Sequence, residues 1–394
     1  MSELLFLAHR APFPPDRGDK IRSWHVLHHL AERARVHLVA FGETAVDREP
    51  PPELARRLAS WTIVPRSKPR AVAAVQALAT GRPVSLLAFA DRRVAAAVAS
   101  VRAAHPIAAT YVFSGQMAQY AGPERVVMDF VDVDSAKFAG LAGRGRGQLA
   151  WLLGREARLL AEYERGVAAQ VNASLFVTEV EAALFRSGGA IGQVLTVENG
   201  IDAAHYNPDA AFARLDQPGP LLVFTGQMDY QPNIDAVTWF ATEILPQVRA
   251  RHPAARFAIV GRAPTIAVRA LAQGEGVIVT GAVEDVRPWL AAADVAVAPL
   301  RIARGVQNKV LEAMAMARAV VATPAAAEGI DHAGALRVAD DDFATAVNDL
   351  LERRDEARAL GRAARARMLA RYAWPARLAP LDALLGLDPV RAAA

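Results

Sequence analysis

The sequence predicts an α/β protein built from two doubly wound parallel sheets. Short apolar runs alternate with amphipathic stretches through both halves of the chain, and this alternation is typical of parallel strands joined by crossover helices. The runs are continuously apolar, so both faces of each sheet should be covered by helices. With 394 residues, the chain is also long for a single core and suits two domains.

The expected strands follow one another at intervals that leave room for helices. Residues 20–34, for example, place Ile21, Trp24, Leu27 and Leu30 at near-helical spacing, which predicts a helix. The expected strands of the first half are LLFLAHR, VHLVAF, WTIVP, TYVF, VVMDFV and SLFVT, and those of the second half are PLLVFTG, RFAIVG, VIVTG, DVAVAPL and RAVVAT.

The best candidate for a domain boundary is the segment 197–220, which contains Asn-Gly, Asn-Pro and Pro-Gly-Pro breakers. The first domain should occupy residues 1–196 and the second residues 197–370. Residues 371–394 carry leucines and Trp374 that must pack against something. Two such domains should face a cleft, and in parallel sheets ligands bind beyond the carboxyl ends of the strands.

Composition excludes several classes of function. Lys and Arg number 45 against 41 Asp and Glu, a net charge of +4, so nucleic-acid binding is not indicated. The absence of cysteine excludes disulfides, thiolate catalysis and Cys-ligated zinc. The N-terminal run lacks the features of a signal peptide. Residues 103–123 are uncharged but contain Pro106 and Gly115, which indicates a buried strand with its connections. We expect a cytoplasmic protein.

The stretch GVQNKVLEAMAMARAVVAT (305–323) carries the most chemical information. A helix should begin near Asn308, after the strand DVAVAPL, and its free N–H groups favour an anion. Lys309 adds a positive charge there, and Glu312 lies one turn further along the same face. A phosphate at the helix tip would leave Glu312 near a sugar diol. The alternative is an ordinary surface ion pair between the two side chains.

Three further loops could approach a ligand. Gly226 ends a strand in FTGQMDYQPNIDAV, and Asn233 should cap the following helix; a plain tight turn is the alternative. Arg262 follows the strand RFAIVG and could clamp a phosphate, or it is a solvated loop arginine. Gly18 lies in the proline-stiffened loop PFPPDRGDK, which is similar to a ligand-covering loop.

The first domain contains three aspartates at or just after the end of an expected strand, in VVMDFVDVDSAKF. Asp132 and Asp134 match a D-x-D pattern that can hold a divalent metal, but such sites need further carboxylates or substrate phosphates. We expect Asp129 and Asp132 to face the cleft and bind sugar hydroxyls, with no metal.

Taken in order, these motifs resemble the retaining two-domain GT-B glycosyltransferases of the family that includes sucrose-phosphate and mannosyl-lipid synthases. The chain looks most similar to sugar transferases associated with exosortase/PEP-CTERM exopolysaccharide clusters. The likeness covers nearly the whole chain. It rests on PFPPDRGDKIRSWHVLHHLA, VENGIDAAHYNPD, FTGQMDYQPNIDAV, FAIVGRAP, VTGAVEDVRPWLAAADVAVAPL and GVQNKVLEAMAMARAVVAT.

The resemblance implies a nucleotide diphosphate sugar, of UDP or GDP type, bound mainly by the second domain. Lys309 would meet the diphosphate and Glu312 the ribose hydroxyls. Val283 would line the base pocket, and Gly18 would approach the donor from the first domain. The last helix, after about Trp374, would cross back onto the first domain.

The sequence departs from the family pattern at two places. The family often has a glutamate seven residues before the one at 312, and here that position is Gly305. Sugar recognition would then fall to Arg301, Gln307 or Asn308. Many members also carry a histidine after the fourth strand of the first domain, where this chain has Ser114 and Gln116.

The expected function is retaining, metal-independent transfer of a hexose to a glycan or lipid-linked acceptor, without a cofactor. Alternatives are a sugar-nucleotide epimerase of the same fold, for which cleft carboxylates are not identified, and a non-catalytic nucleotide-sugar-binding protein. A nicotinamide oxidoreductase is disfavoured because G-x-G-x-x-G is absent after the expected strands. Peripheral contact with the inner face of the membrane is suggested by the WLL run (151–153) and by a basic group of residues, Arg56, Arg57, Arg66, Lys68 and Arg70.

Overall fold

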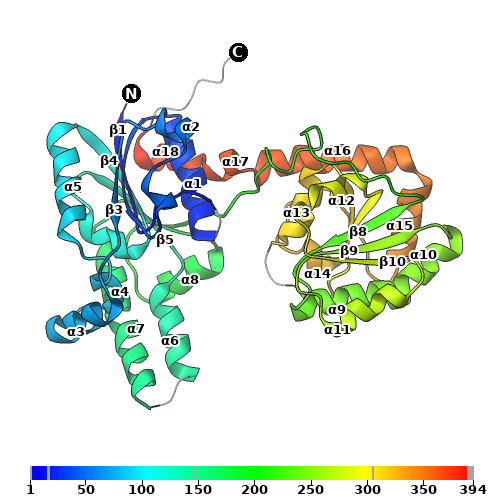
Figure 1. The fold of residues 1–394 in the computed structure, drawn as a ribbon, viewed down its shortest axis with the longest axis horizontal. Coiled ribbons are helices and arrows are strands. Elements are labelled where there is room, and N and C mark those ends of the chain that lie inside the picture. The colour runs from blue at the N-terminus through cyan, green and yellow to red at the C-terminus, as the bar shows by residue number, and fades with distance from the viewer. Residues whose placement is uncertain (1, 16–17, 145–146, 304–305, 388–394) are drawn as a thin grey trace. The chain divides into compact units, whose positions relative to one another are not determined.

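The computed structural model describes residues 2–15, 18–144, 147–303 and 306–387. It divides the chain into two compact units (Figure 1): unit 1 comprises residues 1–199 and 377–394, and unit 2 comprises residues 200–376. Each unit contains one parallel sheet with helices on both faces, which confirms the predicted fold class. The sequence predicts domain boundaries after residues 196 and 370, and the structure divides the chain after residues 199 and 376.

The sheet of unit 1 has the strand order β3-β2-β1-β4-β5-β6-β7, and all of its pairs are parallel. Central strands such as β1 and β5 are buried on both faces, as their continuous apolar runs predict. The strands are β1 (Glu3–Ala8), β2 (Arg35–Gly42), β3 (Ser60–Pro65), β4 (Ile107–Phe113), β5 (Arg125–Val131), β6 (Ala173–Phe176) and β7 (Val194–Thr196).

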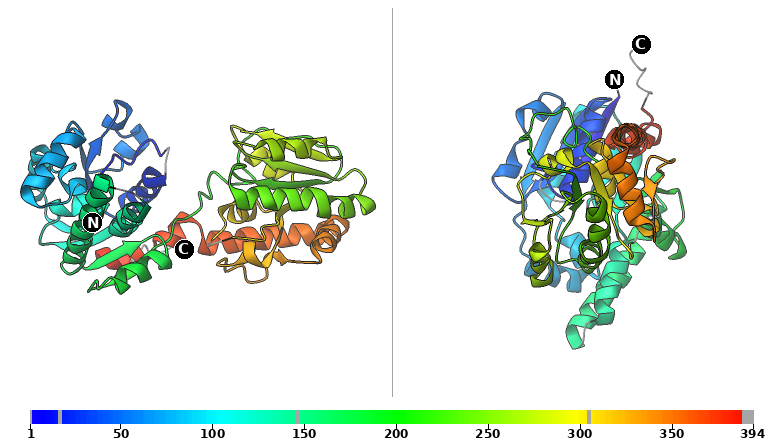
Figure 2. Two further views of the ribbon diagram at one scale, coloured as in Figure 1. Left: turned by 90° about the horizontal axis from the view of Figure 1, so that it is seen from below. Right: turned by 90° about the vertical axis from the view of Figure 1, so that its right-hand side faces the viewer.

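The helices of unit 1 connect these strands. Two of them, α6 and α7, form a hairpin that extends away from the sheet of this unit (Figure 2). The helices are α1 (Gly18–Ala31), α2 (Pro52–Ala55), α3 (Arg70–Thr80), α4 (Val84–Leu87), α5 (Arg92–Ala104), α6 (Asp134–Arg144), α7 (Gly147–Ala168), α8 (Glu179–Ser187) and α18 (Pro380–Leu385), with short 3₁₀ turns η1 (Val46–Arg48) and η2 (Gly115–Tyr120).

Helix α1 buries charged side chains that its apolar spacing does not reveal. Arg22 is 1% exposed, whereas Ile21 beside it is 38% exposed. The Arg22 guanidinium donates to the Asp129 carboxylate over 2.8 Å, and the Tyr111 hydroxyl donates to the same carboxylate oxygen. A buried charge is tolerated when it is paired and hydrogen-bonded, so this network determines how α1 packs on the sheet.

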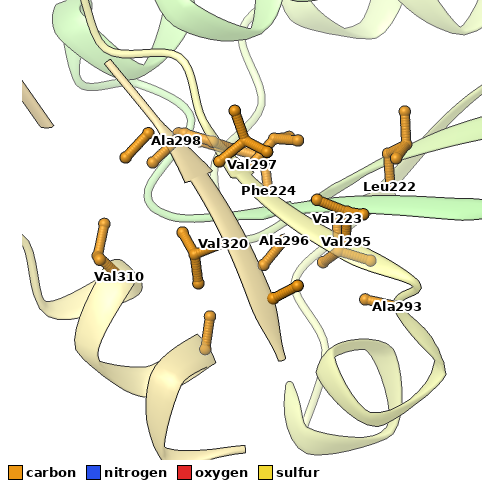
Figure 3. Packing of buried hydrophobic residues seen from close by; sticks show 14 of the residues in the cluster. Leu222, Val223, Phe224, Ala293, Val295, Ala296, Val297, Ala298, Val310 and Val320 are labelled. Atoms are coloured by element: carbon orange, nitrogen blue, oxygen red, sulfur yellow. The ribbon is translucent and has the colours of Figure 1, made fainter. Parts of the chain in front are cut away.

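The sheet of unit 2 has the strand order β10-β9-β8-β11-β12-β13, again with parallel pairing. Its core is made of side chains from the central strands and the helices against them (Figure 3), among them Phe224, Val297, Val310 and Val320. The strands are β8 (Leu221–Thr225), β9 (Arg256–Val260), β10 (Val277–Gly281), β11 (Val295–Ala298), β12 (Ala319–Ala322) and β13 (Arg337–Val338).

The helices of unit 2 lie on both faces of its sheet, and α17 spans the division between the units. They are α9 (Gln231–Trp239), the π-helical turn η3 (Phe240–Ile244), α10 (Leu245–Arg251), α11 (Ile266–Ala270), the 3₁₀ turn η4 (Leu271–Gln273), α12 (Arg287–Ala292), α13 (Asn308–Ala315), α14 (Pro324–Ala327), α15 (Phe343–Glu352), α16 (Arg354–Arg371) and α17 (Trp374–Leu378).

The C-terminal segment returns to unit 1. The Asp382 carboxylate of α18 lies 2.8 Å from the ring nitrogen of His29 on α1, and it accepts a hydrogen bond of 3.0 Å from Arg33, which follows that helix. Leu381 and Leu385 are buried, so the leftover apolar residues of the tail complete the core of this unit. Within the described residues, no helix is both long and apolar enough to cross a membrane.

The buried Arg22–Asp129 pair gives a stability prediction. Asp129→Ala leaves a buried guanidinium without its carboxylate and should lower the free energy of unfolding by about 3–5 kcal/mol. Chemical denaturation measures this change. Glu179→Ala, which removes an exposed ion pair with Arg186, is the control and should change the free energy of unfolding far less, because exposed ion pairs contribute little. An equal cost in the two variants would contradict the role assigned to the buried pair.

Candidate functional site

Lys309 lies in the first turn of α13, at the carboxyl end of β11 in unit 2. Its ammonium donates a hydrogen bond of 2.6 Å to the Asn233 side-chain oxygen and stands 4.8 Å from the centre of the Phe224 ring. Within the described residues it forms no ion pair with Glu312 or another carboxylate within 4.0 Å. The alternative of a surface ion pair is therefore not what the structure contains.

Asn233 is not the helix cap that the sequence suggests. Helix α9 begins at Gln231, and Tyr230 occupies the N-cap position without a side-chain hydrogen bond. Asn233 lies in the first turn and is 4% exposed. Its amide nitrogen donates to the Gln227 carbonyl over 2.8 Å, and its oxygen accepts from Lys309. Asn233 thus connects the loop after β8 to α13, because a buried amide satisfies both of its polar ends.

Two glycines allow the loops after β8 and β9 to touch. A Cβ on Gly261, whose φ is 154°, would overlap the carbonyl oxygen of Gly226. A Cβ on Gly226 would lie 2.9 Å from the Asn233 side-chain nitrogen. The structure requires glycine at both positions for this packing, and the close approach predicted for Gly226 is made to its own chain.

Glu312 lies one turn after Lys309 and faces Tyr206, from the segment that enters unit 2. Burial raises the pKa of the Glu312 carboxyl to about 7, opposed by a hydrogen bond from Tyr206 and by the charge of Lys309. Burial likewise lowers the pKa of Lys309 to about 8, opposed by the charge of Glu312. Both shifts mark groups whose charged forms lack water or a close counter-ion, which is common at functional sites.

The remaining predicted residues of unit 2 surround this pair at varying distance. Arg262 is exposed and donates to the Gln227 side chain over 3.0 Å. Val283 is half-buried against the core. Asn308, the first residue of α13, is exposed, and Gln307 precedes it as N-cap without capping through its side chain.

Two other positions do not join the Lys309 pair. Arg301 follows β11, and its guanidinium lies 5.4 Å from the centre of the ring of Trp239, the last residue of α9. Gly305 falls outside the described residues.

The predicted residues of unit 1 do not form one group. Gly18 starts α1, and nothing in the described structure approaches its Cβ position within 4 Å. Asp132 is exposed after β5. Asp129, in contrast, is fully buried and bound by Arg22 and Tyr111. The expectation that it binds a sugar hydroxyl is wrong for this arrangement, because its carboxylate is inside the core of unit 1.

The carboxyl ends of β4 and β5 carry backbone strain that the sequence does not reveal. Ser114 and Val131 both adopt left-handed backbone, with φ of 78° and 73°, and such conformations in non-glycine residues concentrate at functional positions. The turn at Ser114 leads to Gln116, whose amide donates to Asp134 over 3.0 Å. Burial raises the pKa of Asp134.

A cavity of about 570 Å³ lies beside these strand ends, entirely within unit 1. Its polar lining includes Arg10 and Arg66, which follow β1 and β3, together with Gln116, Asp134 and Lys137. Arg10 forms an ion pair of 2.7 Å with Asp19. The apolar lining comes from α3, α4, α6 and α7. Sequence reasoning missed this cavity, because its residues are scattered over seven segments.

Among the described residues, potential metal ligands converge at Glu3, His37 and His105 in unit 1. Glu3 Oε2 lies 2.9 Å from His37 Nε2 and 3.1 Å from His105 Nδ1, so the ring nitrogens already have a hydrogen-bonding partner. Glu3 begins β1 and His105 precedes β4. This cluster is therefore at the amino ends of the strands, opposite the loops discussed above.

Solved structures resemble the chain along nearly its full length. Sucrose-phosphate synthase from Thermosynechococcus elongatus is 16% identical, with a TM-score of 0.56 and 98% of both chains covered. HepE from Anabaena, in complex with UDP, is 14% identical with a TM-score of 0.54, covering 98% of this chain and 100% of the other. An E. coli trehalose-6-phosphate protein bound with UDP-2-fluoro glucose is 12% identical, with a TM-score of 0.60 and the same coverage. The chain has the GT-B fold.

Part of this GT-B chain also matches a family model. Residues 219–353 match that of the glycosyl transferases group 1. The matched segment contains Gly226, Asn233, Lys309 and Glu312. No curated protein matches the sequence.

The raised pKa of Glu312 gives a prediction for the apo protein. Folding favours its protonated form, so its contribution to stability is fully present below about pH 4.5 and is lost as pH rises through about 7. Glu312→Gln removes that loss. It should raise the melting temperature at pH 8, by an amount equivalent to about 1–3 kcal/mol, and less at pH 5. Exposed Glu243→Gln is the control. Parallel pH profiles of wild type and Glu312→Gln would contradict the burial of this charge.

Proposed function

We propose that the chain is a retaining glycosyltransferase. It moves a hexose from a nucleotide diphosphate sugar, of UDP or GDP type, to a glycan or lipid-linked acceptor, in exopolysaccharide biosynthesis. The observation that carries this proposal is Lys309, held by Asn233 and Phe224 at the start of α13 with Glu312 one turn away. The family match over the same segment supports it, as do the UDP and UDP-sugar complexes of proteins with the same fold.

The chemistry follows from where charge develops. As the bond from the sugar anomeric carbon to the β-phosphate oxygen breaks, negative charge accumulates on the diphosphate. The first amides of α13 and the Lys309 ammonium stabilise that charge as it forms. The acceptor hydroxyl attacks the anomeric carbon on the face that the phosphate leaves, and the departing phosphate oxygen takes its proton. No protein base and no metal is required in this scheme.

Glu312 serves binding in this proposal. Its carboxylate accepts hydrogen bonds from the two ribose hydroxyls, while Val283 contacts the base and Arg262 the outer phosphate region. The charged form of Glu312 is costly in the apo protein because the group is buried. Diol donors repay part of that cost, since hydrogen bonds to charged groups are stronger than those to neutral ones.

Nucleotide binding tests the donor site. UDP or GDP should bind the wild type, and Lys309→Ala and Glu312→Ala should each weaken binding about ten- to a hundredfold, because each removes a charge-assisted hydrogen bond. Isothermal titration calorimetry measures this change. The matched controls are Arg358→Ala and Asp355→Asn, which remove exposed charges from α16 of the same unit. Unchanged affinity in both site variants would refute the assignment.

Turnover tests the reaction class. With an α-configured nucleotide sugar as donor, the glycoside product should also be α, and 1 mM EDTA should leave the rate unchanged. The anomeric coupling constant in the NMR spectrum of the product identifies the configuration. A β product would refute retention, loss of activity in EDTA would refute metal independence, and nucleotide binding without release of nucleotide from any donor–acceptor mixture would indicate a binding protein.

A further inference from the structure

We propose that the face of unit 1 formed by α3, α6 and α7 docks on an anionic lipid surface, and that the cavity beside it receives an amphiphilic acceptor with an apolar chain and an anionic head group. This inference rests on the proposed function and names the class of its acceptor. We call the exposed apolar residues of the three helices the apolar face; they are Val72, Val75, Leu78, Leu141, Leu149, Trp151 and Leu152.

The apolar face is unusual in its concentration. Val75, Leu149 and Trp151 are 67%, 62% and 63% exposed. Single exposed apolar residues are ordinary, but a group on neighbouring helices marks an interaction surface. The helices are neighbours, because the Arg155 side chain of α7 donates to the Ala77 carbonyl of α3 over 2.8 Å. Figure 2 shows the α6–α7 hairpin extending from the sheet of this unit.

The charge around the face selects an anionic occupant. The sequence contains no Asp or Glu between residues 54 and 90, or between residues 135 and 155. Exposed Arg82 and Lys137 lie in these segments. A second copy of the chain would bring the same cations against one another, whereas anionic lipid complements them. Amphipathic helices with aromatic and basic residues bind membrane interfaces through this combination.

The basic group that the sequence suggests for membrane contact is a different set and is largely engaged. Arg57 forms an ion pair with Glu32, and Arg66 forms one with Glu43. The Lys68 ammonium donates to the carbonyls of Leu87 and Ala90. These side chains hold unit 1 together, so we assign lipid contact to the three helices instead.

The cavity continues the apolar face inward. Leu78 and Leu152 belong both to the face and to the cavity lining, with Ala74, Phe138 and Leu153 also lining it. The lining also includes Lys137, whose ammonium group makes no hydrogen bond and no ion pair within 4.0 Å with the described residues. The lining therefore offers apolar surface to a chain and the Lys137 ammonium to an anionic head group. Lys137 is in α6, which follows the carboxyl end of β5. The head lies at the carboxyl ends of the strands, where ligands of parallel sheets bind.

Vesicle sedimentation tests the docking surface. The full chain should cosediment with vesicles of 60:40 phosphatidylcholine and phosphatidylglycerol, and at least fivefold less with phosphatidylcholine alone or in 0.5 M NaCl. Leu149→Ser/Trp151→Ser should reduce cosedimentation at least fivefold. The control Val180→Ser/Ile191→Ser, which alters similarly exposed residues elsewhere in unit 1, should behave as wild type. Failure of the wild type to cosediment, equal binding to both compositions, or equal loss in the control would overturn the proposal.

Thermal shift with decyl phosphate tests the cavity. Decyl phosphate below its micellar concentration should raise the melting temperature, whereas inorganic phosphate should not. Ala74→Phe, which fills the cavity, should abolish the shift. Lys137→Gln is a surface change that does not threaten folding. It should reduce the thermal shift caused by decyl phosphate and leave the shift caused by decyl maltoside unchanged. Equal stabilisation by inorganic phosphate, or no effect of Lys137→Gln, would overturn the assignment. UDP binding is measured on the same samples; if it persists while lipid and decyl phosphate fail, the proposed function stands and this inference falls.

Discussion

The ammonium group of Lys309 is held at the start of α13 by a neutral amide oxygen and the face of a phenyl ring. A neutral partner orients the charge without cancelling it, and the ring attracts it weakly. Holding the amide there requires Asn233 to reach across from α9, and Asn233 reaches because Gly226 leaves space beside it. Gly226 in turn packs on Gly261. The loops after β8, β9 and β11 therefore meet around the Lys309 ammonium, which has no counter-ion within 4.0 Å among the described residues.

Stability and ligand binding oppose each other at this point. A counter-ion for Lys309 would offset the cost of burying its charge, and it would occupy the position that we propose for the donor diphosphate. The same reasoning applies to Glu312, whose burial beside Tyr206 disfavours its charge. Burial moves the pKa values of the two groups toward each other, and their mutual attraction only partly opposes these shifts. Polar groups held ready in this way cost little reorganisation when a charged ligand arrives.

The sequence predicts the sheets well because a continuous apolar run is a local signal, and parallel pairing follows from the helices between the runs. The position of Lys309 at a helix start is local too. The hydrogen bond between Asn233 and Lys309 is not a local feature. In the sequence, an asparagine before an apolar run favours a helix cap, and only the fold brings α13 against it. The prediction for Asp129 was wrong for a related reason. In a strand buried on both faces, the alternation of side chains does not indicate which way a carboxylate points. Arg22, 107 residues away, supplies its partner.

Unit 1 follows a different physical logic from unit 2. Its strand ends include Ser114 and Val131, whose backbone is strained. Several of its cations, such as Arg10, Arg66 and Lys68, are bound by carboxylates or carbonyls close to the sheet. The exception is the part furthest from the sheet, where stretches of α3, α6 and α7 without Asp or Glu leave leucines, valines and a tryptophan in water. Even Glu156, the first acid after this stretch, is turned inward to accept from the amides of Val84 and Ser85 at the start of α4. A surface kept free of negative charge and rich in exposed apolar area is unfavourable in water alone. In the docking proposed for this face, contact with anionic lipid would remove the apolar area from water and give the cations their complement, so that the cost in the free protein would become affinity at the membrane.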